Sequence, residues 1–419
     1  MLTITKILLI SAWLCISAAA AFAQNQNGQG GNGQGGNLVL VKKVNVGGIG
    51  LGAFDISFDD PEIQRYILAD QTNASIDLLR SDLGIFIARI GSLCVAGNPA
   101  PHFCFQGVVL KPGGGVNTAL SGPDGVVIVD DKEIWAGDGD SRIKVIDIST
   151  KSFVTTISTG GEFRVDEMAY DSRDHMLAAA NDDTPPFVTI FDTSSKTIIG
   201  KLVFQTGSAN ANVDAENGIE QSAWSPLTGL FYISVPQVGS DPSIGGVSVI
   251  DPSTMTVTGT FLVKDCSPAG LALGPNHEAL LGCSAAFGTP PKTKSLIIDI
   301  TSTDFTNVNG AVVATVPIGG SDEVWYDPGT QHYFLAANNN LAGKGSPAPI
   351  LGSIEAMDHQ LDGSIPSSIT SHSVAADQDS HLVFLPAGLV PPASTTPDPH
   401  NPCPKTGCIA VYFDQDAQQ

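Results

Sequence analysis

Acidic side chains recur at one position of a repeated sequence unit, and they are the residues of this chain best placed for chemistry. Each unit contains a short apolar run, and the residues at the start of that run are polar in most units. These pairs are Phe54-Asp55, Asn117-Thr118, Asp166-Glu167, Glu220-Gln221, Ala269-Gly270, Asp322-Glu323 and His372-Ser373. Carboxylates that lie close together raise one another's pKa or bind a cation, and their oxygens suit Ca²⁺ or Mg²⁺.

The site residues that we predict follow from these positions. The candidate metal ligands are Asp166, Glu167, Asn181, Glu220, Asp322 and Glu323. Further ligand-binding candidates, at the same positions or at the polar ends of the following runs, are Asp55, Asp70, Asn117, Asp138, Asp182, Gln221 and Asn338. Two alternatives stay open for the acidic rim, namely a solvated surface and a site for a cationic organic ligand.

Histidine and tryptophan add two further hypotheses. His372 is the only one of the 8 histidines at such a position, and we predict a general base or soft ligand, with a hydrogen-bonded structural histidine as the alternative. Trp135, Trp224 and Trp325 are assigned to the innermost strands, where they would wall a ligand site or pack neighbouring units together. No C-x-x-C-H is present, and the glycine-rich GGIGLG (47–52) is not followed by a helix. We therefore expect no haem, nucleotide or flavin.

The elements that must position these residues are short strands. β-branched runs that end in aspartate recur as RIKVIDIST (142–150), FVTIFDTSS (187–195), GVSVIDPST (246–254) and SLIIDITST (295–303). A Ser/Thr turn and a second β run follow each of them, which is the pattern of a hairpin. A further pair of β runs precedes each hairpin, so a unit holds four strands, as does a propeller blade.

The number of units fixes the architecture. The innermost strands are expected to begin at Asp55, Thr118, Glu167, Gln221, Gly270, Glu323 and Ser373. Their spacing is about fifty residues, apart from one insertion around Cys94 and Cys104. The last unit offers three strands, whereas LVLVKKVNVGG (38–48) resembles a fourth strand. The sequence therefore predicts an all-β, seven-bladed β-propeller (38–419) with four-stranded blades, closed by the N-terminal strand completing the last blade.

These hairpins resemble those of the YVTN-type repeat propellers, including the periplasmic YncE-like proteins, although no literal Tyr-Val-Thr-Asn occurs. The resemblance implies the propeller fold, and propellers host binding proteins and enzymes alike. We expect a binding or scaffold protein whose acidic channel mouth holds a small ligand, a cation or a protein loop. The alternative is a metal-dependent lactonase or hydrolase, because gluconolactonase-type propellers are similar in placing carboxylates and an Asn around one divalent ion. Those enzymes usually have six blades.

The N-terminal sequence indicates export. Residues 1–23 contain Lys6, an apolar run and the ending Ala21-Phe22-Ala23, which is typical of a cleaved signal peptide, and a membrane anchor is the alternative. Residues 24–37 contain only Gln, Asn and Gly, as a flexible linker would. We expect a secreted or periplasmic monomer with no membrane span in the mature chain.

Charge and cysteine content limit the partners. Loss of Lys6 with the leader changes the formal charge from −22 to −23, so we expect a small molecule or an extracytoplasmic protein as partner, not nucleic acid. Six of the 7 cysteines remain after Cys15 is removed. Their spacing predicts the disulfides Cys94–Cys104, Cys266–Cys283 and Cys403–Cys408.

Overall fold

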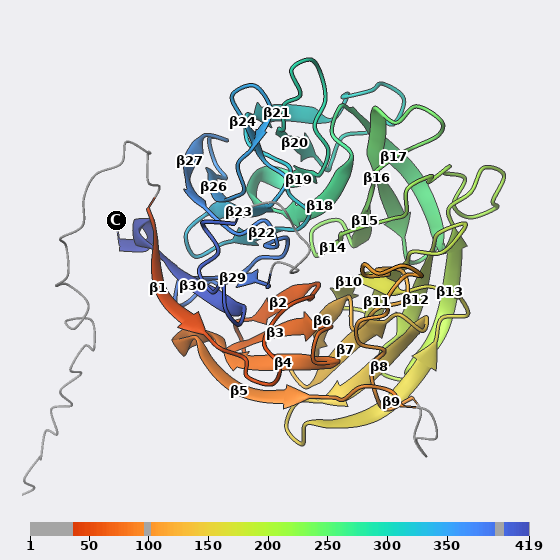
Figure 1. The fold of residues 1–419 in the computed structure, drawn as a ribbon. Coiled ribbons are helices and arrows are strands. Elements are labelled where there is room, and N and C mark those ends of the chain that lie inside the picture. The colour runs from red at the N-terminus through yellow and green to blue at the C-terminus, as the bar shows by residue number, and fades with distance from the viewer. Residues whose placement is uncertain (1–36, 96–101, 390–397, 419) are drawn as a thin grey trace, which may run out of the picture. The chain divides into compact units, whose positions relative to one another are not determined.

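Seven four-stranded antiparallel sheets follow one another around a ring in the computed structural model (Figure 1). The structure describes residues 37–95, 102–389 and 398–418. The predicted all-β, seven-bladed propeller is confirmed. The predicted signal peptide (1–23) lies outside the described residues, as does the predicted linker (24–37) apart from Asn37.

The strands of each blade run from the ring centre outward. Blade one comprises β2 (Ser57–Asp60), β3 (Arg65–Asp70), β4 (Ser75–Arg80) and β5 (Ile85–Ile90). Blade two comprises β6 (Val126–Val129), β7 (Glu133–Asp138), β8 (Arg142–Asp147) and β9 (Ser152–Ser158). Blade three comprises β10 (Val165–Asp171), β11 (Met176–Asn181), β12 (Phe187–Asp192) and β13 (Thr197–Val203). Blade four comprises β14 (Ser222–Ser225), β15 (Leu230–Val235), β16 (Ile244–Asp251) and β17 (Thr256–Lys264). Blade five comprises β18 (Pro268–Leu273), β19 (Glu278–Cys283), β20 (Ser295–Asp299) and β21 (Val312–Val316).

The last two blades carry the irregular connections. Blade six comprises β22 (Val324–Asp327), β23 (His332–Ala337), β26 (Ile350–Glu355) and β27 (Leu361–Pro366), with the small hairpin β24 (Leu341–Ala342) and β25 (Ser346–Pro347) inserted. Blade seven comprises β28 (Ala375–Asp377), β29 (Leu382–Ala387), β30 (Cys408–Asp414) and β1 (Leu38–Val44). Among the described residues, short 3-10 helices lie at η2 (Ser81–Leu83), η3 (Pro275–His277) and η4 (Gln415–Gln418).

The aspartate at the end of the third strand makes the outer hairpin turn, as predicted. Asp147 accepts hydrogen bonds through Oδ1 from the backbone N–H of Thr150 and the hydroxyl of Ser149, both at 2.7 Å. The same bond to the turn backbone is made by Asp192 with Ser195, by Asp251 with Ser253 and by Asp299 with Thr301. The repeated aspartates are therefore turn residues, and they take no part in the ring centre.

The hydrophobic core is divided among the junctions of the blades. Buried apolar residues of the described chain form seven clusters, and each cluster joins two neighbouring blades. Trp135 belongs to one of them, because it lies in β7, the second strand of blade two, and packs edge-on against Phe191 of blade three at 5.8 Å. Its predicted place on an innermost strand was wrong, since the first strand of blade two ends at Val129.

Blade two begins later than predicted. Its first strand starts at Val126 rather than near Thr118, because the Gly- and Pro-rich stretch before it lacks the consecutive β-branched residues that Val126–Val129 supply. Asn117 therefore lies in the connection between β5 and β6, where its backbone N–H donates to the Val109 carbonyl at 2.7 Å.

The N-terminal strand completes the last blade, as predicted. β1 pairs antiparallel with β30, from Leu38 opposite Asp414 to Val44 opposite Ile409. The three predicted disulfides are also present, with Cα–Cα distances of 5.0 Å for Cys94–Cys104, 4.5 Å for Cys266–Cys283 and 5.7 Å for Cys403–Cys408. In the part of the chain that the structure describes, no helix has the length and apolar character needed to cross a membrane.

Deletion of residues 38–44 should open the ring, because the edge of β30 would lose its partner. We expect the Tm to fall by roughly 10 °C or more if closure contributes about 5 kcal/mol. Deletion of 24–36 is the matched control and should leave the Tm unchanged. Differential scanning calorimetry of both truncations measures the difference, and equal Tm values would contradict this role of β1.

Candidate functional site

Equivalent backbone positions bring carboxylates to one end of the ring. The start face is the face at which the innermost strands β2, β6, β10, β14, β18, β22 and β28 begin, and the end face is the one at which they end. Asp55, Asp124 and Glu220 occupy the same position in blades one, two and four. Their N–H groups donate to the penultimate residue of the second strand, namely Ala69, Gly137 and Ser234, at 2.9, 3.0 and 2.9 Å.

Asp124 was missed by the sequence analysis because the start of blade two was misplaced. It takes the position given to Asn117, is fully buried, and accepts a hydrogen bond from the Gln71 amide at 2.9 Å. Gly125 permits this arrangement, since a Cβ at that position would lie 1.4 Å from the backbone oxygen of Asp166. Blades two and three therefore meet closely enough to bring Asp124 and Asp166 together.

Arg164 is the central cation of the site, and the sequence analysis also missed it. Its guanidinium contacts Asp166 at 2.5 Å, Asp55 at 3.1 Å and Asp182 at 3.5 Å, and its side chain is only 15% exposed. A signal existed, because Arg164 directly precedes Val165, the first residue of β10. Carboxylates of blades one and three thus converge on one buried positive charge.

His372 supplies a second positive charge. Its ring stacks on Phe54 with centroids 4.6 Å apart, Nδ1 bonds the Thr370 carbonyl at 2.8 Å, and Nε2 lies 3.7 Å from Asp55. Burial lowers the pKa of His372, but the nearby carboxylate of Asp55 outweighs burial and raises the pKa to about 9. An imidazolium has no free lone pair, so these contacts favour an ion pair with Asp55 over a general base.

Asp55 is correspondingly held ionised. Burial opposes its ionisation, but the neighbouring His372 and the charge of Arg164 lower the pKa of Asp55 below its usual value. The two cations of the site therefore share one carboxylate, which leaves less positive charge for the other acids.

Glu167 and Glu323 lack such compensation. Glu323 accepts a hydrogen bond from Ser373 at 2.7 Å through Oε2, and Ser373 contacts Ser57 at 2.7 Å. Oε1 of Glu323 is buried without a partner. Glu167 is 5% exposed, its carboxylate retains slight solvent access, and it makes no hydrogen bond or ion pair within the described chain. Burial, and then the charge of Glu323, raise the pKa of Glu167 well above its usual range. Burial and the charge of Asp55 do the same for Glu323.

Glu220 and Asp322 complete the acidic group, and both are only partly buried by surface exposure. Burial raises the pKa of Glu220 to about 8 against the opposing charge of Arg164, with Asp322 adding to the rise. Burial also raises the pKa of Asp322, although the charge of His372 lowers it. Every one of the six predicted rim carboxylates therefore lies within the electrostatic reach of Arg164 or Glu167.

The residues at the ends of the second strands mostly do not join this group. Asp138 forms an ion pair with the fully buried Lys144 at 2.8 Å, and Asp70 bonds the side chain of Asn73 at 2.6 Å. The side-chain amide of Asn181 donates to Thr159 at 2.8 Å and to Ser141 at 3.3 Å, and its oxygen accepts from Thr189 at 3.2 Å. The side chains of Asp70 and Asp138 therefore make contacts within their own blades, and that of Asn181 also joins blade three to blade two.

Two of the remaining candidates lie differently. Asp182 reaches Arg164, as noted above, and therefore belongs to the site. Asn338 follows β23, and its side-chain oxygen is buried without a hydrogen-bond partner.

A cavity of about 340 Å³ follows the channel beneath the acidic group. Its lining begins with Glu167 and Gln221 near the start face and reaches Tyr170, Ser172 and Trp325 toward the end face. Glu167 is buried, Trp325 is partly exposed and Ser172 is exposed. The exposure of the lining increases along the strands, so the cavity opens on the end face.

Gln221 helps to close the other end of the cavity. Its side-chain oxygen accepts hydrogen bonds from the N–H groups of Leu271 at 2.7 Å and Val324 at 3.2 Å, and its amide nitrogen donates to the Val324 carbonyl at 3.2 Å. One side chain of blade four thus links blades five and six. Together with Arg164 and its carboxylates, it makes the channel a pocket that is closed toward the start face.

The rim carboxylates do not have the spacing of a compact metal centre. Among the described residues, the one group of three or more His, Cys, Asp or Glu whose ligand atoms lie within 4.8 Å of one another is His332, Asp414 and Asp416. A divalent ion at the rim would therefore need side chains to move closer together.

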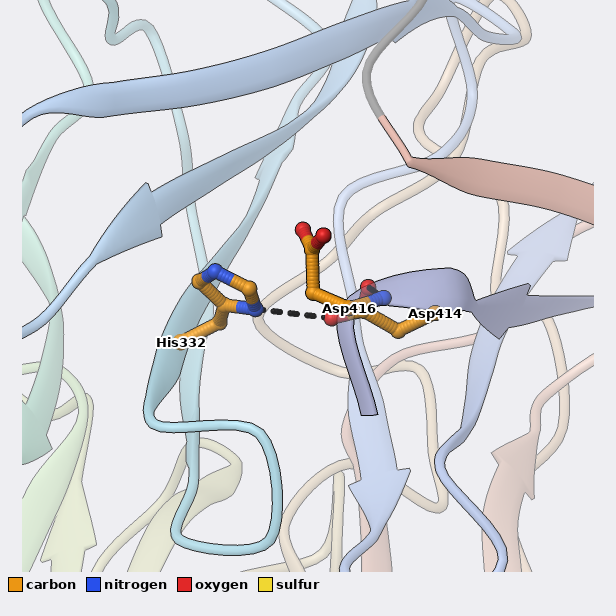
Figure 2. Close-up of side chains that lie close together, drawn as sticks. All are labelled: His332, Asp414 and Asp416. Atoms are coloured by element: carbon orange, nitrogen blue, oxygen red, sulfur yellow. Dashed lines mark hydrogen bonds and ion pairs between the residues drawn. The ribbon is translucent and has the colours of Figure 1, made fainter. Parts of the chain in front are cut away.

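The His332 group holds the seam of the ring (Figure 2). His332 of blade six is 1% exposed, and its Nδ1 lies 2.7 Å from Asp414 of blade seven. Its Nε2 lies 3.2 Å from Glu355, and Asp416 bonds the side chain of Asn37. Both ring nitrogens already have partners, so these contacts join the blades next to the closing strand β1.

The comparisons with known proteins show a fold and no family. No model of a protein family matches the sequence, and no curated protein is similar to it in sequence. A chain of a mitotic checkpoint complex matches the structure at a TM-score of 0.57 and 13% identity, over 98% of each chain. U3-55K matches at a TM-score of 0.58 and 12% identity, over 88% of this chain and 98% of its own chain. Hydrazine synthase of Kuenenia stuttgartiensis matches at a TM-score of 0.56 and 12% identity, over 80% of this chain and 92% of its own chain.

Stability should fall as the pH rises from about 5 to about 9. Glu220 titrates near 4.5 when unfolded and near 8 when folded, so the folded state loses stability through that window. The pKa of His372 is raised from 6.5 to about 9. The stability that His372 contributes is therefore fully present below pH 6.5 and is lost as the pH rises to about 9. The Tm measured against pH checks this, and Glu220→Gln should flatten the curve between 5 and 8. A Tm that rises with pH would contradict the assignment.

Arg164→Met should destabilise the fold strongly, by about 3–5 kcal/mol, because buried carboxylates would lose their counter-ion. Adding Asp166→Asn should recover part of the loss, since the closest carboxylate is then neutral. Arg173→Met, on a side chain that is 52% exposed, is the matched control and should change little. Urea unfolding measures the three variants, and an equal effect at Arg164 and Arg173 would contradict the central role of Arg164.

Proposed function

We propose that this protein is a secreted or periplasmic binding protein whose propeller channel holds a cation beside Glu167 and Glu323. The observation that supports this most directly is that Glu167, 5% exposed, lines the closed end of the cavity without a hydrogen-bond or ion-pair partner in the described chain. Buried carboxyl groups are normally hydrogen-bonded or paired. A positively charged ligand would supply the missing partner.

The charge balance of the site points the same way. Eight carboxyl groups surround two cationic side chains, and these groups are Asp55, Asp124, Asp166, Glu167, Asp182, Glu220, Asp322 and Glu323 around Arg164 and His372. Mutual repulsion and burial make the full ionisation of such a set unfavourable. A bound cation would relieve that repulsion, and the ligand is thus expected to carry positive charge.

The proposed location rests on different observations. Three disulfides suit an oxidising compartment, and the sequence of 1–23 is typical of a signal peptide. The resemblance of the hairpins to YVTN-type repeats, which include periplasmic YncE-like proteins, agrees with export. A propeller of this kind is suited to binding on one face or in its channel.

Binding is favoured over the lactonase alternative by the state of the candidate residues. In the resemblance to gluconolactonase-type propellers, an Asn joins carboxylates around one divalent ion, but the amide of Asn181 is already bonded to Thr159, Ser141 and Thr189. Were Ca²⁺ or Mg²⁺ to bind, the candidate ligands with unpartnered oxygens would be Glu167, Glu220, Asp322 and one oxygen of Glu323, and the ion would supply charge neutralisation there.

Ca²⁺, Mg²⁺ or methylammonium should raise the Tm of the purified protein, because a ligand that binds only the folded state stabilises it by about 2.7 kcal/mol at a hundredfold excess over Kd. The variant Glu167→Gln combined with Glu323→Gln should lose this rise while being at least as stable without ligand, since neutral amides replace repelling acids. Glu216→Gln, on an exposed carboxylate, is the control and should keep the response. If none of these cations moves the transition of the wild type, the proposed function is wrong.

A further inference from the structure

We infer that the ligand of the channel is an organic ammonium ion with an aromatic or aliphatic arm, and that it enters from the end face. This inference rests on the proposed function and names its ligand class. The cationic group would reach Glu167 at the closed end, and the arm would lie along the channel wall toward Trp224 and Trp325.

The partly exposed side chains that line the cavity beyond its acidic end are mainly aromatic, namely Phe58, Tyr170, Trp224, Trp325 and Tyr326, whereas several aliphatic lining residues are buried in the clusters between blades. Besides Glu167, Gln221 and three serines, the lining consists of Ile56, Phe58, Val126, Val127, Ile128, Met168, Ala169, Tyr170, Ala223, Trp224, Leu271, Ala272, Leu273, Val324, Trp325 and Tyr326. A hydrated divalent ion gains nothing from such a wall, since it prefers several oxygen ligands. An ammonium group with an apolar arm gains from both the carboxyl end and the wall.

The aromatic rings lie where an arm would pass. Phe58 of blade one meets Trp325 of blade six edge-on at 5.5 Å, across the short β28 with its small residues Ala375 and Ala376. Trp224, on the other side of the channel, already has the guanidinium of Arg173 5.6 Å from its ring centroid. The charge of Arg173 is offset by Asp174 at 3.0 Å, which reduces its repulsion of an ammonium ion that enters from the end face.

Entry from the start face is blocked by side chains that hold one another. Gln221 links blades four, five and six, and Arg164 is bonded to Asp55 and Asp166. Opening that end would break a buried ion-pair network. The end face needs no such change, because Trp325 and Tyr326 are already partly exposed there. A cavity of about 340 Å³ is at the lower end of the size of small-molecule sites, so the ligand is a small amine.

Binding of an ammonium ion should release a proton. Burial and the charge of Glu323 raise the pKa of Glu167 well above its usual range, so they favour the protonated form of Glu167 in the free protein. A cation is paired best by the ionised form, so we expect the release of about one proton per ligand. The affinity should accordingly rise with pH until the amine itself deprotonates, which distinguishes this site from a surface of ionised carboxylates.

Titration calorimetry of the full mature chain tests the inference with phenethylammonium as probe, and with methylammonium, 2-phenylethanol and Ca²⁺ as comparisons. Phenethylammonium should bind about tenfold or more tightly than methylammonium, and 2-phenylethanol should not bind measurably. Repeating the titration in buffers of different ionisation enthalpy should show the proton release. Glu167→Gln should weaken phenethylammonium about tenfold to a hundredfold and abolish the release, whereas Glu216→Gln should do neither.

Trp224→Leu keeps Glu167 and removes one aromatic wall, so it should weaken phenethylammonium several-fold and leave methylammonium unchanged. Binding of Ca²⁺ or methylammonium at Glu167 without any preference for phenethylammonium would overturn this inference and leave the proposed function standing. Equal binding of 2-phenylethanol would overturn it as well, because charge would then not matter. Failure of every cation to bind would overturn both.

Discussion

The pairing of β1 with β30 is the constraint on which the rest of the structure depends. The blades are joined by apolar clusters between neighbours, so a ring with one open junction would expose one of these faces and a free strand edge. Closure also brings the first strands of all blades to a common axis. Only then do Asp55 of blade one, Arg164 of blade three and His372 of blade seven meet, although more than three hundred residues separate the first from the last.

The site that results is defined by a shortage of positive charge. Arg164 and His372 both contact Asp55, so they leave Glu167 and the unbonded oxygen of Glu323 with little compensation. Burial then favours the protonated forms of these acids, as the raised pKa values of Glu167 and Glu323 indicate. The closed end of the channel is thus acidic in composition, while burial favours the uncharged forms of Glu167 and Glu323. This arrangement suits a cationic ligand whose binding releases a proton.

The fold was predictable from sequence because the residues that specify its turns and strands are close together in the chain and recur in each blade. The aspartate of each outer hairpin, such as Asp147, specifies a turn through neighbours two or three residues away, and alternating apolar runs specify strands. The site was predictable only in part. The spacing of the repeats placed Asp55, Glu167 and Glu323 at the ring centre. A strand pattern does not predict that Arg164 forms ion pairs there, or that the amide of Asn181 is hydrogen-bonded to its neighbours. Such facts depend on which side chains of different blades face each other.

The stability cost of Glu167 favours a binding role of the channel. Unpaired buried acids destabilise a fold, and several buried carboxylates of the described chain have partners, as Asp138 has in Lys144 and Asp377 has in Ser81. Both oxygens of Asp59 are also buried without a partner, but Asp59 does not line the cavity, whereas Glu167 does. An amide or an apolar residue at position 167 would fill the same space without repulsion. A side chain that lowers stability and lies on the wall of an open cavity is more readily explained by what it binds than by what it supports.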